Sequence, residues 1–214
     1  EVGAFAATAE ADLHGIACCA GSSGPGHVHL INGVYEAHKT RVPMLVIAST
    51  CATYEFGTDY FQETNPIKLF DDCSCYNQMI TRPEQVQRMV QNALQQAISK
   101  RDVAVIGLPG DVSEMEAVQM NTSTKVFFTE PQIRPSEMEI GRLAQYINQA
   151  EKITLFCGVG AKKAQQQIVA LSQKIHAPVG YSFKAKLDIQ RDNPNEIGMT
   201  GLLGMASAFQ SMHH

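Results

Sequence analysis

The sequence lacks the residue patterns of several common enzyme classes. It has no HExxH motif, no Ser/His/Asp order and no pair of carboxylates placed for acid–base chemistry, so a hydrolase is not supported. Its glycine-rich segment, residues 21–26, has neither the GxGxxG spacing of a dinucleotide fold nor the GK(S/T) ending of a P-loop. A nucleotide-binding loop of either kind is therefore not expected there.

Charge, long apolar runs and paired cysteines are also scarce. Charged residues make up 18% of the chain and the formal net charge is −4, which leaves no basic stripe for nucleic acid. The apolar runs, such as Met44–Ala48, have the length of a strand and are too short to cross a bilayer, and we expect no secretory signal. The six cysteines include no CxxC pair, so we expect buried or half-buried free thiols and a reducing, cytoplasmic location.

What is present is the pattern of an α/β protein. The 214 residues are 44% hydrophobic, which suits one large core or two modest ones. Helical and strand patterns alternate over residues 1–114, break at the polar, proline-containing stretch 115–136, and resume over residues 137–214. We expect two doubly wound parallel-sheet domains with a linker between them.

Both ends of the sequence look interrupted. Position 1 falls in an alanine-rich helical pattern with no N-cap residue before it. The sequence stops at Met212-His213-His214, without an element that closes the second domain. We therefore expect a fragment in which both domains are incomplete, and the two terminal histidines fit either a tag or natural sequence.

The glycine-rich segment is the most informative local feature. A short apolar run precedes it, an amphipathic stretch follows, and a second apolar run begins at Met44, which together predict a βαβ unit. The segment would then lie at the carboxyl end of a parallel strand, where α/β proteins bind small molecules. Its glycines suit either a tight structural turn or the close approach of a flat ligand to the backbone.

The longer stretch SxGPGxxHLxNGxxxAxxxxVPxLxIA, residues 22–48, resembles the N-terminal domain of the pyruvate oxidases, a family that depends on thiamine diphosphate (ThDP). Quinone-linked pyruvate dehydrogenases and phosphate-dependent, oxygen-using pyruvate oxidases both belong to it. The resemblance implies that Gly24, Pro25 and Gly26 lie against the aminopyrimidine half of ThDP and that His29 lies near the reacting centre. His27 occupies a position that varies in the family, and no role is expected for it.

The same resemblance assigns roles to three further residues. The segment YFQET, residues 60–64, matches the oxidase pattern (T/Y)FQE on a loop after the second strand. Phe61 would lie between thiamine and flavin, and the Gln62 amide would hydrogen-bond the bound substrate. The family pattern HEEVGA has its catalytic glutamate first, and Glu1 aligns with the second glutamate, so the catalytic carboxylate is expected one residue upstream and Glu1 is the lesser candidate.

The second half of the chain has segments that resemble the family's FAD-binding middle domain. They are a GVGA turn at 158–161, SFKAK at 182–186 and GMTGLLG at 198–204. A GxG turn alone is more often a tight connection than a cofactor loop, and related decarboxylases keep this domain without flavin. The residues that the resemblance assigns to FAD are Gly158, Gly160, Ala161, Ser182, Lys184, Thr200, Gly201 and Leu202.

The resemblance implies a parent enzyme that oxidatively decarboxylates pyruvate to acetate or acetyl phosphate and CO₂, with quinone or O₂ as electron acceptor. Mg²⁺ and the ThDP diphosphate would be held by a C-terminal domain outside this sequence, and each site would form between subunits of a homo-oligomer, a dimer of dimers. Peripheral contact with the inner face of the cell membrane would come only through that C-terminal part. An acetohydroxyacid synthase-like carboligase and a non-catalytic domain fragment remain as alternatives.

Overall fold

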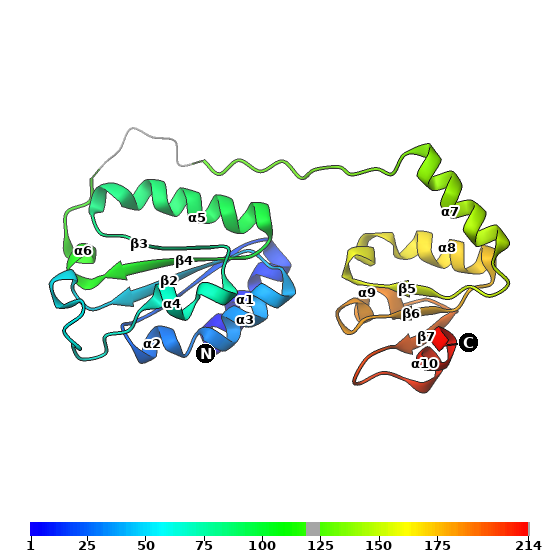
Figure 1. The fold of residues 1–214 in the computed structure, drawn as a ribbon, viewed down its shortest axis with the longest axis horizontal. Helices are drawn as coiled ribbons and strands as arrows, with labels where there is room; N and C mark the ends of the chain where they lie inside the picture. Colours follow the sequence, from blue (N-terminus) through cyan, green and yellow to red (C-terminus); the bar gives the residue numbers. More distant parts are fainter. Residues whose placement is uncertain (119–124, 214) are drawn as a thin grey trace. The chain divides into compact units, whose positions relative to one another are not determined.

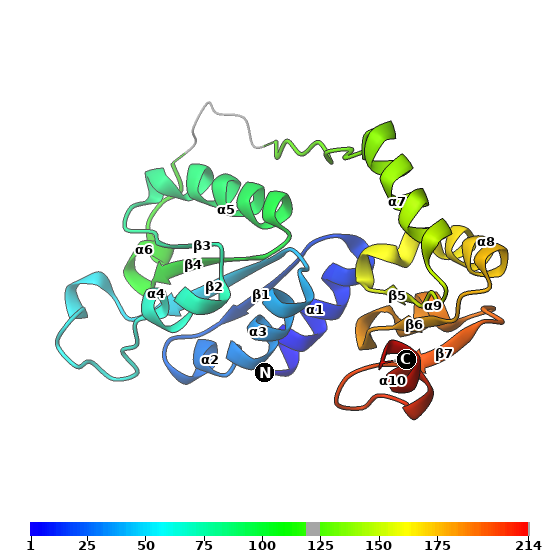
Figure 2. The same ribbon diagram turned by 45° about the vertical axis from the view of Figure 1, so that its right-hand side comes forward.

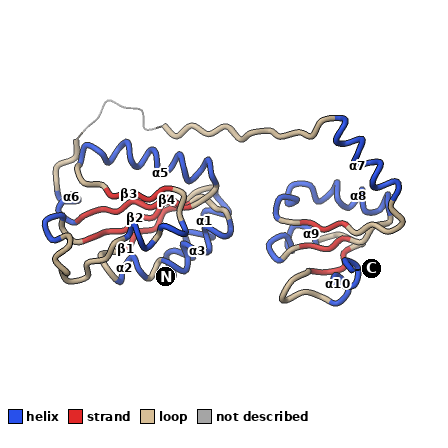
Figure 3. Tube along the Cα trace, in the orientation of Figure 1, coloured by secondary structure: helices blue, strands red, loops and turns tan. Residues whose placement is uncertain are grey.

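The computed structural model describes residues 1–118 and 125–213, and the chain divides into two compact units, residues 1–131 and 132–214. Each unit is built on a parallel β-sheet with helices around it (Figures 1 and 3). The predicted α/β class is therefore confirmed. Part of the predicted linker, residues 119–124, and the last histidine lie outside the described residues, and the described parts of 115–136 contain neither helix nor strand.

The first unit has a four-stranded parallel sheet in the order β1-β2-β4-β3. Helices α1 and α3 cover one face of this sheet and α5 covers the other (Figures 1 and 2). The elements are α1 (Val2–His14), β1 (Ala17–Gly21), α2 (Pro25–Val28), α3 (Ile31–Thr40), β2 (Met44–Thr50), α4 (Pro66–Leu69), β3 (Tyr76–Met79), α5 (Val86–Lys100), β4 (Val103–Pro109) and α6 (Gly110–Glu114), with short 3₁₀ helices at Thr53–Glu55, Asp71–Cys73 and Pro83–Gln85.

Strands β2 and β4 form the centre of the first core because both of their faces are buried. Alternate residues of a strand point to opposite faces of the sheet. Met44, Val46 and Val105 accordingly join the cluster with α1 and α3, whereas Leu45 and Ile106 join the cluster with α5. This alternation explains why the two strands read as continuous apolar runs in the sequence.

The second unit has a three-stranded parallel sheet in the order β5-β6-β7. Buried side chains from all three strands and from α9, such as Cys157, Val179, Ile189 and Met199, form its core. The elements are α7 (Glu137–Gln149), β5 (Leu155–Cys157), α8 (Gln165–Ile175), β6 (Val179–Tyr181), α9 (Lys186–Gln190), β7 (Glu196–Met199) and α10 (Ala206–His213), with 3₁₀ helices at Val159–Ala164 and Phe183–Ala185.

The cysteines are structural rather than reactive in character. All six are free, and burial raises the pKa of the Cys19 thiol to about 11 and that of Cys73 to about 12. Cys18 is exposed, in contrast to the expectation of buried or half-buried thiols, because successive residues of β1 point to opposite faces at the edge of the sheet. Within the described residues, no helix has the length and apolar character needed to span a membrane.

Candidate functional site

The candidate site lies at the carboxyl edge of the first sheet. Strands β1, β2, β4 and β3 are parallel, so the chain leaves all of them at this edge, and the glycine-rich turn follows β1 directly. A long loop, residues 51–65, follows β2, and helix α6 follows β4. Ligands of open α/β sheets bind outside the carboxyl ends of the strands, so these connections form the natural binding surface of this unit.

The glycine-rich turn is tight, and Gly24 is the residue that makes it possible. Gly24 has φ 64° and ψ −120°, a backbone conformation that side chains with a Cβ rarely adopt. The turn closes through backbone hydrogen bonds from the His27 amide to the Ser22 carbonyl (3.0 Å) and from the Val28 amide to the Gly24 carbonyl (3.1 Å). Gly24 is buried, whereas Pro25 is exposed and Gly26 half-buried, so the accessible part of the turn is Pro25 and Gly26.

The structure brings the predicted ThDP-side turn and the predicted substrate loop into direct contact. The Ser23 hydroxyl donates to the Gln62 carbonyl oxygen at 3.0 Å, across 39 residues of sequence. A Cβ placed on Gly24 would lie 2.8 Å from the Gln62 Cβ and from its carbonyl oxygen. Gln62 itself has φ 62°, and its side chain is exposed. The glycine turn is therefore the surface on which Gln62 rests.

The Glu63 carboxylate organises the loop that carries Gln62. One of its oxygens accepts from the Gly57 amide at 2.7 Å and the other from the Tyr60 amide at 3.3 Å. The Glu63 amide in turn donates to the Tyr60 carbonyl at 2.8 Å. Phe61, predicted to lie beside the cofactor, is 79% exposed and free to contact a ligand.

The two histidines after the turn differ in burial. His29, expected near the reacting centre, is exposed at the end of α2. His27, for which no role was expected, is fully buried, with Nδ1 2.9 Å from the Ser49 carbonyl oxygen and Nε2 2.7 Å from the Thr64 hydroxyl. Burial lowers the pKa of the His27 imidazole.

A second junction at the same edge joins β4 to the loop after β2. The Asp111 carboxylate accepts from the Thr53 hydroxyl at 2.5 Å and from the Thr53 amide at 2.9 Å. These hydrogen bonds lower the pKa of the Asp111 carboxyl, and the one from the Thr53 hydroxyl has the largest effect. Sequence analysis did not single out Asp111, although Pro109-Gly110-Asp111 ends a buried strand at the functional edge.

Glu1 is the exposed N-cap residue of α1, and its carboxylate accepts from the Asn32 side-chain amide of α3 at 2.9 Å. This contact joins the start of α1 to the start of α3. Its place as the lesser catalytic candidate stays a prediction.

In the second unit, the predicted FAD residues gather at the carboxyl edge of the three-stranded sheet. The Ser182 amide donates to the Cys157 carbonyl (3.0 Å) and the Thr200 amide to the Tyr181 carbonyl (3.2 Å), so the segments after β5, β6 and β7 lie side by side. A Cβ on Gly158 or on Gly160 would meet no other atom within 4 Å. The remaining predicted residues belong to the same three segments: Ala161 is half-buried, and Lys184, Gly201 and Leu202 are exposed.

The turn at Gly158 differs from the expected strand-to-helix connection. A 3₁₀ helix, Val159–Ala164, intervenes, and α8 begins only at Gln165. Two glycines close together disfavour an α-helical start because each loses more conformational freedom than other residues do. The backbone that a diphosphate could approach here is therefore that of the 3₁₀ segment and not the N-terminus of α8.

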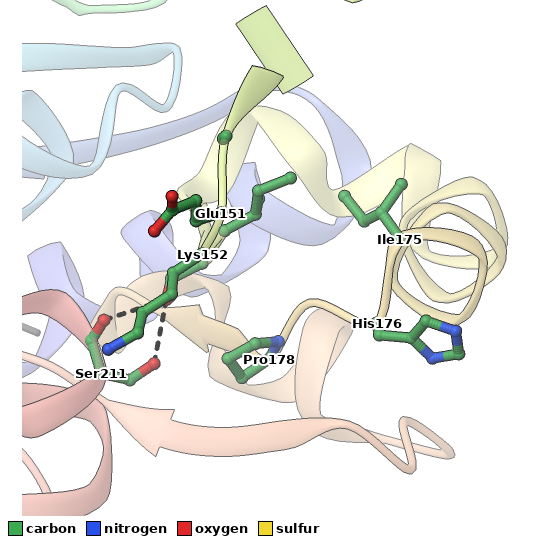
Figure 4. Close-up of a pocket in the computed structure, with 9 residues that line it drawn as sticks. Glu151, Lys152, Ile175, His176, Pro178 and Ser211 are labelled. Atoms are coloured by element: carbon green, nitrogen blue, oxygen red, sulfur yellow. Dashed lines mark hydrogen bonds between the residues drawn. The ribbon is translucent and has the colours of Figure 1, made fainter. Parts of the chain in front are cut away.

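A cavity of the second unit lies at the other end of its sheet. About 450 Å³ in volume, it is lined by Lys152, Thr154, His176, Pro178 and Ser211, among others (Figure 4). Thr154 and Pro178 come just before β5 and β6, so this cavity opens at the amino edge. It is separate from the predicted FAD segments. Among the described residues, no three His, Cys, Asp or Glu side chains gather in a way that would hold a metal ion.

Comparison with known proteins adds two family matches. Residues 1–69 match the thiamine pyrophosphate enzyme N-terminal TPP binding domain, and residues 140–214 match the thiamine pyrophosphate enzyme central domain. The two matches fall one in each unit of the fold.

Curated relatives share nearly the whole chain. It is 41% identical to the "Uncharacterized 42.6 kDa protein in isoamylase 3'region" of Pseudomonas amyloderamosa, covering 99% of this chain and 54% of that protein. It is 30% identical to pyruvate oxidase of Lactiplantibacillus plantarum, with 99% and 36% covered. It is 28% identical to acetolactate synthase of Arthrospira platensis, with 89% and 34% covered. The chain thus spans between about a third and a half of the length of these relatives.

Proposed function

Because this chain belongs to the thiamine pyrophosphate enzymes, we propose that it supplies the pyrimidine-side half of a ThDP site in an enzyme that oxidatively decarboxylates pyruvate. The products would be CO₂ and acetate or acetyl phosphate, and the electrons would pass to quinone or O₂. The observation that carries the proposal is the contact between Gly24 and Gln62. It puts an exposed amide side chain beside the turn to which the sequence resemblance assigns the cofactor.

The turn fits the flat aminopyrimidine ring of ThDP. Gly21 and Gly24 shape the turn, since a Cβ on Gly21 would lie 2.6 Å from the Gly26 carbonyl oxygen and one on Gly24 would strike Gln62. The part of the turn left for a ring is Pro25, which is exposed, and Gly26, which is half-buried and has no side chain. When bound, ThDP supplies the electron sink that takes up the electron pair left as CO₂ departs.

The residues of the loop after β2 would bind and orient pyruvate. The Gln62 amide can donate a hydrogen bond to a carboxylate or carbonyl oxygen without adding a titrating group. Phe61, exposed beside it, offers an apolar ring that would exclude water from the reacting carbon. The Glu63 carboxylate is already engaged by two backbone amides, so its part is to hold this loop and not to exchange protons with substrate.

For the second unit we propose FAD as ligand. The open space around Gly158 and Gly160, and the convergence of three strand ends, suit a long cofactor that lies across the carboxyl edge of the sheet. Mg²⁺ and the ThDP diphosphate would be held by protein outside this chain, in a homo-oligomer arranged as a dimer of dimers. We place the enzyme in the cytoplasm, with any membrane contact at the inner face and made outside these residues.

A carboligase of the acetolactate synthase type is the second candidate. The similarity to acetolactate synthase, 28% identity, is close to that with pyruvate oxidase, 30%. Both reactions begin with loss of CO₂ from pyruvate, and they differ in whether the remaining two carbons are oxidised or joined to a second keto acid. The segment Tyr60–Thr64 favours oxidation because it matches the oxidase pattern.

The test is product analysis on the full-length protein with two matched variants. With ThDP, Mg²⁺, FAD and pyruvate, we expect acetate or acetyl phosphate in amounts that follow the electron acceptor, and no acetolactate. Gln62→Glu keeps the side-chain length but repels the substrate carboxylate, so we expect the KM for pyruvate to rise at least about tenfold. Gln62→Asn keeps the amide and should retain more activity. Acetolactate as the main product would assign the chain to the carboligases instead.

A further inference from the structure

His27 is the most completely buried polar side chain at the functional edge. Its side chain has no exposed surface, and it lies in α2 between the end of β2 and the loop before α4. Its ring nitrogens contact the Ser49 carbonyl and the Thr64 hydroxyl, the Ser22 carbonyl also acts on the imidazole, and the centroid of the tilted Phe70 ring is 6.2 Å away. A buried imidazole with a partner on each nitrogen is held in one orientation.

The chemistry of these partners fixes the tautomer of His27. A carbonyl oxygen can only accept, so Nδ1 must carry the proton that is directed at Ser49. In the neutral ring Nε2 is then an acceptor, and the Thr64 hydroxyl donates to it at 2.7 Å. His27 directly follows the glycine-rich turn. Its imidazole therefore joins the end of β2 to the loop that carries Gln62.

Thr64 lies two residues after Gln62, whose backbone is in the left-handed region at φ 62°. A residue other than glycine keeps such a conformation only where its surroundings hold it. On one side Ser23 holds the Gln62 carbonyl, and on the other His27 holds Thr64. Both anchors come from the segment that forms the glycine turn, so the position of Gln62 relative to Gly24 depends on them.

We propose that His27 is a positioning residue that, through its hydrogen bond from Thr64, fixes Gln62 over the glycine turn. The inference rests on the proposed function in so far as Gln62 binds pyruvate. His27 itself does not touch the substrate. Its effect is to keep the amide of Gln62 at one place beside the cofactor surface, so that the binding energy of the substrate is not spent on ordering the loop.

The test uses amide hydrogen exchange together with steady-state kinetics on the full-length protein. Thr64→Val removes the hydroxyl while keeping the shape of the side chain, and Thr64→Ser restores a hydroxyl. Thr8→Val is the control, because the hydroxyl of Thr8 likewise makes a tertiary contact, its one proton being shared between the Ala4 and Gly33 carbonyl oxygens, but Thr8 lies in α1 and is buried where Thr64 is half-buried. Amide exchange at residues 57–64 is measured in the absence of cofactor. The KM for pyruvate is measured in the presence of cofactor.

We expect amide exchange at residues 57–64 to be roughly tenfold faster in Thr64→Val than in Thr8→Val, because one hydrogen bond to the buried imidazole is lost. Thr64→Ser should behave like the wild type. We also expect Thr64→Val to raise the KM for pyruvate by several fold while ThDP affinity stays unchanged. Equal exchange in Thr64→Val and Thr8→Val would overturn the role of His27, whatever reaction is catalysed. Faster exchange with an unchanged KM would leave the His27–Thr64 contact standing and overturn the assignment of Gln62 to pyruvate, and with it the positioning role.

Discussion

Replacement of Gly24 by alanine is expected to destabilise the first unit severely. Alanine held at φ 64° and ψ −120° is strained by about 1–3 kcal/mol. Its Cβ would also lie 2.8 Å from two atoms of Gln62, and crowding of this kind in a packed site costs about 1–3 kcal/mol more. Gln62 cannot easily move away, because Ser23 holds its carbonyl and the Glu63 carboxylate holds the loop around it. The sum is about 4 kcal/mol.

Gly57→Ala is the matched control for this substitution. Gly57 also has a positive φ, 79°, and lies in the loop after β2, but an added Cβ would meet no atom within 4 Å. Alanine at position 57 would therefore have the backbone strain of a positive φ without a steric clash of its Cβ. Amide exchange of the β2 and β4 core measures the stability of the first unit, and we expect Gly24→Ala to accelerate it about a thousandfold and Gly57→Ala about tenfold. Equal acceleration by the two variants would refute the claim that Gly24 is required by its contact with Gln62.

Three further substitutions or conditions test other contacts. Asp102→Ala removes a buried carboxylate that accepts from the Val103 amide (2.7 Å) and pairs with His38 (2.8 Å). The free energy of unfolding, measured in urea, should fall by about 2–3 kcal/mol. A fall below about 0.5 kcal/mol would contradict this role of Asp102. Burial lowers the pKa of His27 below its ordinary 6.5, so the unfolded chain binds a proton that the folded one does not. The first unit should therefore lose stability as the pH falls from about 7 to about 5, and His27→Asn should flatten this dependence; a wild type that unfolds alike at both pH values would count against it. Gly160→Ala should change the free energy of unfolding by no more than about 0.5 kcal/mol, since the added Cβ meets no atom within 4 Å. It should nevertheless weaken the binding of FAD to the full-length protein. Unaltered FAD affinity would argue against the proposed flavin surface.

The local signals of the first unit correctly predicted the strand–turn–helix–strand order around its glycine-rich turn. A strand, a glycine-rich turn and an amphipathic stretch in succession indicated a βαβ unit, and β1, α2, α3 and β2 form it. The contact between Gly24 and Gln62 could not be predicted from spacing, because it joins segments far apart in the chain. Only the resemblance placed both near the cofactor, and the physical reason for their closeness, the missing Cβ of Gly24, is visible only in the fold.

The less regular parts were harder to predict. Strand β3, with the sequence Tyr-Asn-Gln-Met, lies at an edge of the sheet and is only partly buried, so it has no apolar run to mark it. The burial of His27 could not be predicted from the sequence alone, because it depends on the packing of the short helix α2 against β2 and the loop before α4. The expectation for His29, which is exposed, stays a prediction.

The central claim is that the glycine turn and the Gln62 loop together serve the oxidation of pyruvate on ThDP. Anaerobic addition of pyruvate to the full-length protein, loaded with ThDP, Mg²⁺ and FAD, tests it most directly. We expect CO₂ to be released and the flavin absorption to bleach, and Gln62→Glu to slow both at limiting pyruvate. Release of CO₂ with the flavin still oxidised and acetolactate accumulating would contradict it.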